Sequence, residues 1–230
     1  MDFEELKKYQ EVQNAARLTL DNIIDFIRPG ISESDIIEKC DDLQHKAGID
    51  GYWYKSLPAL VLAGNHTTLA ISSAQYNPSN VPIQVNDLVT IDLNPSMAGY
   101  CGDYARTFFV ENGVARRSPL FNQEFIAGAN AQVHLHTKLL QVAHEDMTFN
   151  DLYQIMRKEI EQLGFEQLDY LGHGVQKDMH HLDFIAPVVT RTLGNAELFT
   201  LEPHIRLLGG QYGFKHENIY YFINNKLIEL

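Results

Sequence analysis

One pattern of helix boundaries occurs twice in this chain, 116 residues apart, and it constrains the fold more than any other feature. Ser32 and Asp35 match a capping box, which closes the start of a helix, and Gly48 follows as a helix stop. The same three landmarks recur at a constant shift as Thr148, Asp151 and Gly164. We therefore expect one domain made of two helix–helix–sheet halves, about residues 1–115 and 116–230, with a site between them.

Hydrophobic periodicity predicts the other elements of an α+β fold. Residues 3–28 repeat apolar side chains at three- and four-residue steps, which predicts a helix that ends at Pro29. Ser118 and Pro119 resemble the start of a third helix that continues to about His144. Strands are expected near residues 52–54, 59–63, 67–72, 88–93, 106–110, 167–171, 186–189, 197–205 and 218–223.

Composition limits the class of protein. A chain of 230 residues that is 45% hydrophobic can bury an ample core. Its net charge of -12 argues against a nucleic-acid partner. The first residues lack the basic and apolar regions of a signal peptide, and no apolar run is long enough to span a membrane, so we expect no membrane partner and a cytoplasmic location. Cys40 and Cys101 are expected to be reduced thiols, and the oligomeric state stays open, a homodimer included.

Five residues stand in local contexts that suit metal ligands: Asp92, Asp103, His173, Glu202 and Glu217. Four carboxylates and one imidazole match the charge of two divalent cations and the ligands that first-row ions prefer. Bridging carboxylates can also hold two ions about 3.5 to 4 Å apart, as in metal-assisted hydrolysis.

The first two acids are expected on neighbouring strands. Asp92 ends the apolar run 88–92, Asp103 opens the run 103–110, and the segment between them is rich in turn residues. A hairpin would bring the two carboxylates together. The alternative is a pair of surface acids that flank a loop.

The other three candidates are weaker when each is taken alone. His173 lies between two glycines, where a histidine is more often structural. Alternation in residues 198–206 places Glu202, His204 and Arg206 on one face of a strand, together with Thr200. Glu217 begins the last strand, and by itself it resembles an exposed acid.

The motifs together resemble the pita-bread-fold metallohydrolases, which include methionine aminopeptidases, Xaa-Pro aminopeptidases and prolidases. The matching stretches, in family order, are 28–31 (RPGI), 90–93 (TIDL), 102–108 (GDYARTF), 172–174 (GHG), 199–203 (FTLEP) and 216–218 (HEN). The resemblance implies two pseudo-symmetric halves around a dinuclear metal site. It also implies that Asp92 chelates one ion, that Asp103 and Glu217 bridge both, and that His173 and Glu202 bind the other.

The resemblance further implies a mechanism and a substrate. With two ions of Mn, Co, Fe or Zn, a bridging water or hydroxide would attack the amide carbonyl, and Glu202 would carry the proton. His180 falls where the family keeps a substrate-contacting histidine, although its neighbour His181 competes for that position. His204 is a second candidate to stabilise the oxyanion, with Arg206 behind it. Tyr54 belongs to an aromatic segment that would form either a substrate wall or core.

Departures from the family bear on the substrate. Many of these peptidases carry a histidine about eighteen residues before the first ligand, which is absent here, and His66 could replace it only if its loop is rearranged. Arg106, Thr107 and Phe108 favour the Xaa-Pro branch. We therefore expect an amide hydrolase acting on peptides, an aminopeptidase or dipeptidase of Xaa-Pro type. The alternatives are a methionine aminopeptidase-like enzyme, a hydrolase of non-peptide amides, and a non-catalytic binding module, which retention of all five ligands disfavours.

Overall fold

The structure is a computed structural model, and it describes residues 1–71, 75–177, 179 and 182–230. The helices are α1 (Phe3–Ile23), α2 (Glu33–Lys46), α3 (Gln123–Val142) and α4 (Phe149–Gln162), with short 3₁₀ turns η1 (Gly64–Thr68) and η2 (Gly194–Ala196). The strands that precede α3 are β1 (Gly51–Tyr52), β2 (Leu60–Ala63), β3 (Asp87–Leu93), β4 (Pro95–Met97), β5 (Tyr100–Cys101), β6 (Tyr104–Glu111) and β7 (Val114–Arg116). The strands that follow α4 are β8 (Phe165–Gln167), β9 (Gly174–Val175), β10 (Leu198–Leu201), β11 (His204–Leu207), β12 (Gly213–Lys215), β13 (Asn218–Ile223) and β14 (Lys226–Glu229).

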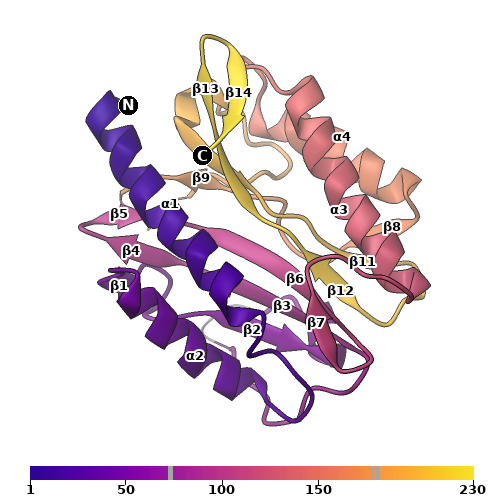
Figure 1. The fold of residues 1–230 in the computed structure, drawn as a ribbon. Helices are drawn as coiled ribbons and strands as arrows, with labels where there is room; N and C mark the ends of the chain where they lie inside the picture. Colours follow the sequence, from indigo (N-terminus) through magenta and orange to yellow (C-terminus); the bar gives the residue numbers. More distant parts are fainter. Residues whose placement is uncertain (72–74, 178, 180–181) are drawn as a thin grey trace.

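The described strands form small antiparallel sheets, ordered β1-β4-β5, β2-β3-β6-β7, β14-β13-β10-β9 and β12-β11-β8. Helices α1 and α2 contact the sheet of β2 and β6, while α3 and α4 contact the sheet of β8, β11 and β12 (Figure 1). Helices and antiparallel sheets packed in layers confirm the expected α+β class. Within the described part of the chain, no helix has the length and apolar character needed to cross a membrane.

Both expected capping boxes are present. In each, the hydroxyl at the N-cap accepts the backbone N–H of the third helical residue, whose carboxylate in turn accepts the N–H of the N-cap residue. Gly48 and Gly164 follow the two helices with φ angles of +91° and +80°, a conformation that favours glycine. The division of the chain into halves near residue 115 stays a prediction.

Two helix boundaries differ from the expectation. Helix α1 ends at Ile23, because the chain turns at Phe26, whose N–H bonds to the carbonyl of Ile23. Helix α3 begins at Gln123 rather than near Ser118, because Asn122 provides the side-chain cap. The Glu111 carboxylate holds the loop that precedes α3 by accepting the backbone N–H groups of residues 120–122.

Several expected strands also differ. The strands expected over 52–54 and 167–171 are shifted toward the N-terminus, as β1 (Gly51–Tyr52) and β8 (Phe165–Gln167). Residues 64–68 form η1, where a strand over 67–72 was expected, and residues 186–189 form no strand. The single strand expected over 197–205 is two strands, β10 and β11, which lie in different sheets and are separated by Glu202 and Pro203. Proline has no N–H to donate to a sheet ladder, so the strand breaks there. This break places Glu202 at the junction of two sheets.

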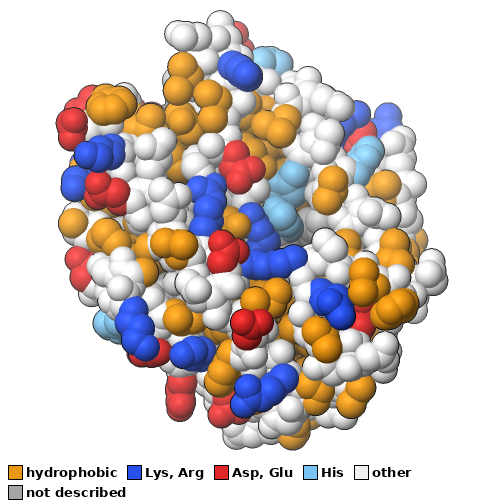
Figure 2. All heavy atoms as spheres, viewed as in Figure 1, with side chains coloured by type: hydrophobic (Ala, Val, Ile, Leu, Met, Phe, Trp, Pro, Cys, Tyr) orange, Lys and Arg blue, Asp and Glu red, His pale blue; other side chains and the backbone are white. Residues whose placement is uncertain are grey.

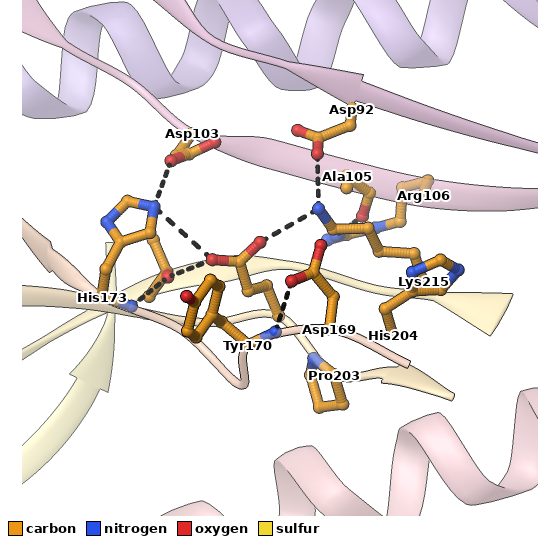
Figure 3. A network of polar contacts seen from close by, with 12 residues as sticks. Asp92, Asp103, Ala105, Arg106, Asp169, Tyr170, His173, Pro203, His204 and Lys215 are labelled. Carbon is orange, nitrogen blue, oxygen red and sulfur yellow. Dashed lines mark hydrogen bonds and ion pairs between the residues drawn. The ribbon is translucent and has the colours of Figure 1, made fainter. Parts of the chain in front are cut away.

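Two main hydrophobic clusters lie beneath the two helix pairs. One includes Leu20, Ile36 and Phe108, and the other includes Phe125 and Phe199, all of them fully or almost fully buried. Cys40 and Cys101 are both buried and unbonded to each other, which confirms the expected thiols. The site described below lies on the strands, on the side away from the helices (Figure 3).

Candidate metal centre

The hairpin that carries the first two acids is confirmed. Strands β3 and β6 pair antiparallel, with Asp92 opposite Ala105 and Leu93 opposite Tyr104. Asp103 immediately precedes β6, so its side chain lies beside the end of β3. Figure 3 shows the Asp92 and Asp103 side chains directed toward His173 and Lys215, which come from the other half of the chain.

His173 presents one ring nitrogen to the acids. Its Nδ1 lies 3.0 Å from the carbonyl oxygen of Gly174, and because a carbonyl only accepts, Nδ1 carries the proton and donates it. Nε2 then lies 3.2 Å from Oδ2 of Asp103 and 3.5 Å from Oε1 of Glu202. A backbone carbonyl that fixes the far ring nitrogen is the usual support of a metal-binding histidine.

The backbone before His173 requires glycine. Gly172 has a φ angle of +147°, and a Cβ there would lie 2.2 Å from the carbonyl oxygen of Thr200. The Thr200 hydroxyl also accepts the His173 N–H at 3.1 Å. These contacts set the position of the histidine against β10.

Glu217 reaches the same cluster because β6 is joined to the segment before β13. The Glu217 N–H donates to the Ala105 carbonyl at 3.0 Å, and Nη1 of Arg106 donates to the Glu217 carbonyl at 2.6 Å. Glu217 is 1% exposed. Glu217 therefore immediately precedes β13, which is followed by β14 and is not the last strand as expected, and it is a buried acid where an exposed one was the alternative.

Burial and mutual repulsion raise the pKa values of two acids in the cluster. Burial, then the charges of Asp92 and Glu202, raises the pKa of Asp103 well above its usual range. Burial, followed by the negative charge of Asp103, likewise raises the pKa of Glu217 well above its usual range. Buried carboxylates of like charge are costly unless a cation joins them.

Sequence reasoning missed Lys215. Its Nζ lies 2.5 Å from Oδ2 of Asp92 and 3.0 Å from Oε2 of Glu202. Burial alone would lower the pKa of this ammonium, but the charges of Asp92, Glu202 and Glu217 outweigh burial and hold it well above its ordinary value. The available signal was the two-residue spacing from Glu217, which can place two side chains on one face of an extended chain.

The donor set fits divalent cations. Ligand atoms of Asp103, His173 and Glu217 lie within 4.8 Å of one another, as do those of Asp92, Glu202 and Glu217. Oδ2 of Asp103 and both carboxylate oxygens of Glu217 are buried and accept no hydrogen bond. Buried acceptors without a donor are rare in folded proteins, and oxygen with imidazole suits Mn, Fe, Co or Zn. All five predicted ligands are thus brought together.

Four of the five candidate ligands and Lys215 form the floor of a cavity of about 420 Å³, and Glu217 is not among the described residues that line it. Aromatic side chains line its walls, among them Trp53, Tyr54, Tyr170 and Phe184. Trp53 and Phe184 lie edge-on to the His173 ring, at centroid distances of 5.8 Å and 6.0 Å. An apolar wall above a charged floor is typical of a small-molecule site. By contrast, the helix-bearing face in Figure 2 shows acidic and basic side chains interspersed.

His204 lines this cavity as predicted, but its ring is already engaged. Nε2 lies 2.6 Å from the carbonyl oxygen of Thr67, so this nitrogen is the donor. Burial, then Lys215, lowers the pKa of His204 to about 4. The neutral ring keeps Nδ1 as an acceptor, so this geometry provides no free N–H for an oxyanion.

The predicted substrate residues are only partly brought together. Tyr54 lines the cavity, whereas His66 and Arg206 are not among the described residues that line it. Nδ1 of His66 lies 3.1 Å from the buried Glu33 carboxylate, and Arg206 pairs with Glu166 at 2.6 Å. His180 and its neighbour His181 lie outside the described residues. The substrate roles of these residues stay predictions.

The family of the chain follows from its sequence match. Residues 7–223 match the model of metallopeptidase family M24, and the chain belongs to that family. This agrees with the acid-and-histidine cluster at the junction of its sheets.

Similar proteins include peptidases of more than one kind. The chain is 26% identical over 209 residues to an Xaa-Pro dipeptidase from Lactobacillus helveticus, covering 90% of this chain and 53% of the relative. It is 23% identical over 210 residues to a methionine aminopeptidase from Rickettsia prowazekii, covering 86% of this chain and 76% of the relative. The chain thus spans about half the length of the dipeptidase.

Solved structures show the fold. A prolidase from Pyrococcus furiosus superposes with a TM-score of 0.84 at 21% identity, covering 99% of this chain and 64% of that one. An X-Pro aminopeptidase from Thermotoga maritima has a TM-score of 0.83 at 20% identity, covering 100% and 61% of the two chains. The expected pita-bread fold is confirmed.

Proposed function

We propose that this chain is a metal-dependent exopeptidase that cleaves the amide bond next to a free amino terminus, with Xaa-Pro peptides as its substrates. The observation that carries the proposal is the set of buried oxygens on Asp103 and Glu217 that accept no hydrogen bond, gathered with Nε2 of His173 beside a cavity that Asp103 and His173 line. The family and the names of its relatives support peptides as the substrate class.

The metal centre in this proposal holds two divalent ions of Mn, Co, Fe or Zn. Asp103, His173 and Glu217 would hold one, while Asp92 and Glu202 would take part at the other with Glu217 between them. When bound, such ions activate water and polarise the scissile carbonyl. The rest of the chemistry belongs to the side chains.

Glu202 is the proposed proton carrier. Its carboxylate lines the cavity, with one oxygen 3.5 Å from Nε2 of His173 and the other 3.0 Å from Nζ of Lys215. A carboxylate at the cavity floor can accept a proton from the attacking water and deliver it to the leaving nitrogen. The aromatic walls formed by Trp53 and Phe184 would exclude other water.

An aminopeptidase is favoured over a dipeptidase by the charges around the cavity. Among the described residues that line it, Lys215 is the only lysine or arginine, and its ammonium is paired with Asp92 and Glu202. A dipeptide would place its own carboxylate in this cavity, where an unpaired charge is unfavourable. Longer Xaa-Pro peptides would keep that carboxylate in solvent.

A hydrolase of non-peptide amides is the second candidate. The supporting observation is His66, the available replacement for the missing family histidine, which pairs with Glu33 away from the cavity lining. A cytoplasmic location and the two-half organisation of one domain complete the proposal and rest on the sequence, while the oligomeric state stays open, a homodimer included.

Peptidase assays would test the proposal. The purified chain, loaded in turn with Mn, Co, Fe or Zn, would be given an Xaa-Pro dipeptide, an Xaa-Pro-Xaa tripeptide, a Met-Xaa peptide and the N-acetylated tripeptide. We expect turnover of the free-amine tripeptide, little of the acetylated one, and loss of turnover in Asp103→Asn but not in the exposed control Asp146→Asn. Preference for the acetylated substrate would favour the second candidate. Equal activity of Asp103→Asn and the unmodified chain would refute both.

A further inference from the structure

The two sides of the acidic cluster differ in the positive charge that they already have. On one side, Oδ2 of Asp103 and both carboxylate oxygens of Glu217 accept no hydrogen bond. On the other side, the Lys215 ammonium contacts Oδ2 of Asp92 and Oε2 of Glu202, at 2.5 Å and 3.0 Å. The Lys215 ammonium thus contacts the carboxylate oxygens that a second metal ion would need as ligands.

Lys215 is held in this position by its backbone. Its N–H donates to the Thr107 hydroxyl at 3.0 Å, and the same hydroxyl donates to the Lys215 carbonyl at 2.8 Å. The side chain is 17% exposed and extends from the end of β12 toward Asp92 (Figure 3), and its ammonium also contacts the Glu202 carboxylate. The ammonium is therefore part of the cluster and not a surface charge that happens to lie near it.

We propose that Lys215 supplies the cation at the Asp92–Glu202 position, so that a second divalent ion can bind there only by displacing the ammonium. The chain would then hold one ion tightly, on Asp103, His173 and Glu217, and a second one weakly. This inference rests on the proposed function in one respect, because it requires that the cluster binds metal.

The reason for the weak second site is the ammonium that would be displaced. Among the described residues, Asp92 and Glu202 are the acids with which Nζ of Lys215 forms ion pairs. If an ion took their oxygens, the ammonium would lose both partners and would be repelled by the ion, while remaining largely buried. We expect the second ion to bind about 10- to 100-fold more weakly than it would without the lysine, the range seen when groups around metal ligands are changed.

Metal binding itself provides the test. Chelator-treated protein would be titrated with Mn²⁺ in a calorimeter, and metal content would be measured after dialysis, for the unmodified chain, Lys215→Met and the exposed control Lys158→Met. We expect one retained ion and a weak second event for the unmodified chain and for Lys158→Met. Lys215→Met should retain two ions, with the second event strengthened at least tenfold.

Several outcomes would overturn the inference. Two ions retained by the unmodified chain, or the same stoichiometry in Lys215→Met as in the control, would do so. If Lys215→Met does not fold, Lys215→Gln replaces it, and Asp92→Asn gives an independent measurement: this variant should keep the tight ion, and its loss would contradict the assignment. Absence of metal from every protein, Asp92→Asn included, would instead refute the proposed function.

Discussion

Gln13 of α1 holds the backbone of Asp103, a residue 90 positions later in the chain, with two hydrogen bonds. The Gln13 side-chain amide donates to the Asp103 carbonyl at 2.6 Å, and its oxygen accepts the Asp103 N–H at 3.0 Å. Both residues are buried. A helix of the first half thus sets the position of a carboxylate at the metal centre, as a group behind a ligand commonly does.

Replacing Gln13 should weaken both folding and metal binding. In Gln13→Leu the buried N–H and carbonyl of Asp103 lose their partners, which should lower the free energy of unfolding by about 1–3 kcal/mol. Mn²⁺ affinity should fall about 10- to 100-fold, because the Asp103 carboxylate is less well positioned. Chemical denaturation and calorimetry would measure the two effects. Asn14→Leu, on the exposed side of the same helix, is the control, and equal metal affinity in the two variants would argue against this role.

Neutralising Glu217 should have opposite effects with and without metal. Burial and the neighbouring acids raise the pKa of Glu217, so its charge destabilises the metal-free protein at neutral pH. We expect Glu217→Gln to raise the metal-free stability by about 1–3 kcal/mol. The same change removes a ligand, so added Mn²⁺ should raise the melting temperature far less than in the unmodified protein. Thermal melts in chelator and in Mn²⁺ would show both effects, with the exposed Glu38→Gln as control; a metal-free Glu217→Gln that melts lower than the unmodified chain would contradict the prediction.

His136 should make the protein sensitive to acid. Burial lowers its pKa to about 3 from an ordinary value of 6.5, and the neutral ring is satisfied by donating to the His216 carbonyl and accepting from the Tyr220 hydroxyl. Between these pKa values the unfolded chain binds a proton that the folded chain does not. The stabilising contribution of neutral His136 is therefore complete above pH 6.5 and falls by about 1.4 kcal/mol per pH unit as the pH drops toward 3.

A comparison of variants separates the contribution of His136 to the free energy of unfolding from the contributions of other titrating groups. The free energy of unfolding of the unmodified chain, minus that of His136→Asn, should decrease as pH falls from 6.5 to 4. His144→Asn, which changes an exposed histidine, should follow the pH dependence of the unmodified chain. If the unmodified chain and His136→Asn give parallel curves, the histidine does not stay neutral in the folded protein.

The parts of the site that depend on neighbouring residues were predictable. The runs that end at Asp92 and begin at Asp103 are rich in strand-forming residues and are joined by turn residues, so the hairpin follows from local preferences, and β3 pairs with β6 as expected. The capping boxes at Ser32 and Thr148 are equally local, and both form. The prediction of one continuous strand through Glu202 was wrong. The alternation of side chains continues past Pro203, but the proline has no N–H, and this ends the strand pairing.

The amino-acid sequence alone determined the ligand types, their order, the capped helices and the family resemblance, because each depends on residues close together in the chain. Only the tertiary structure decided which charges meet. Lys215 reaches Asp92 across a separation of 123 residues, through the pairing of its backbone with Thr107. His66 and Arg206 are directed instead to Glu33 and Glu166. Coulomb interactions act through space, so the packing of the sheets, and not the spacing of residues in the sequence, selects the partners of each charge.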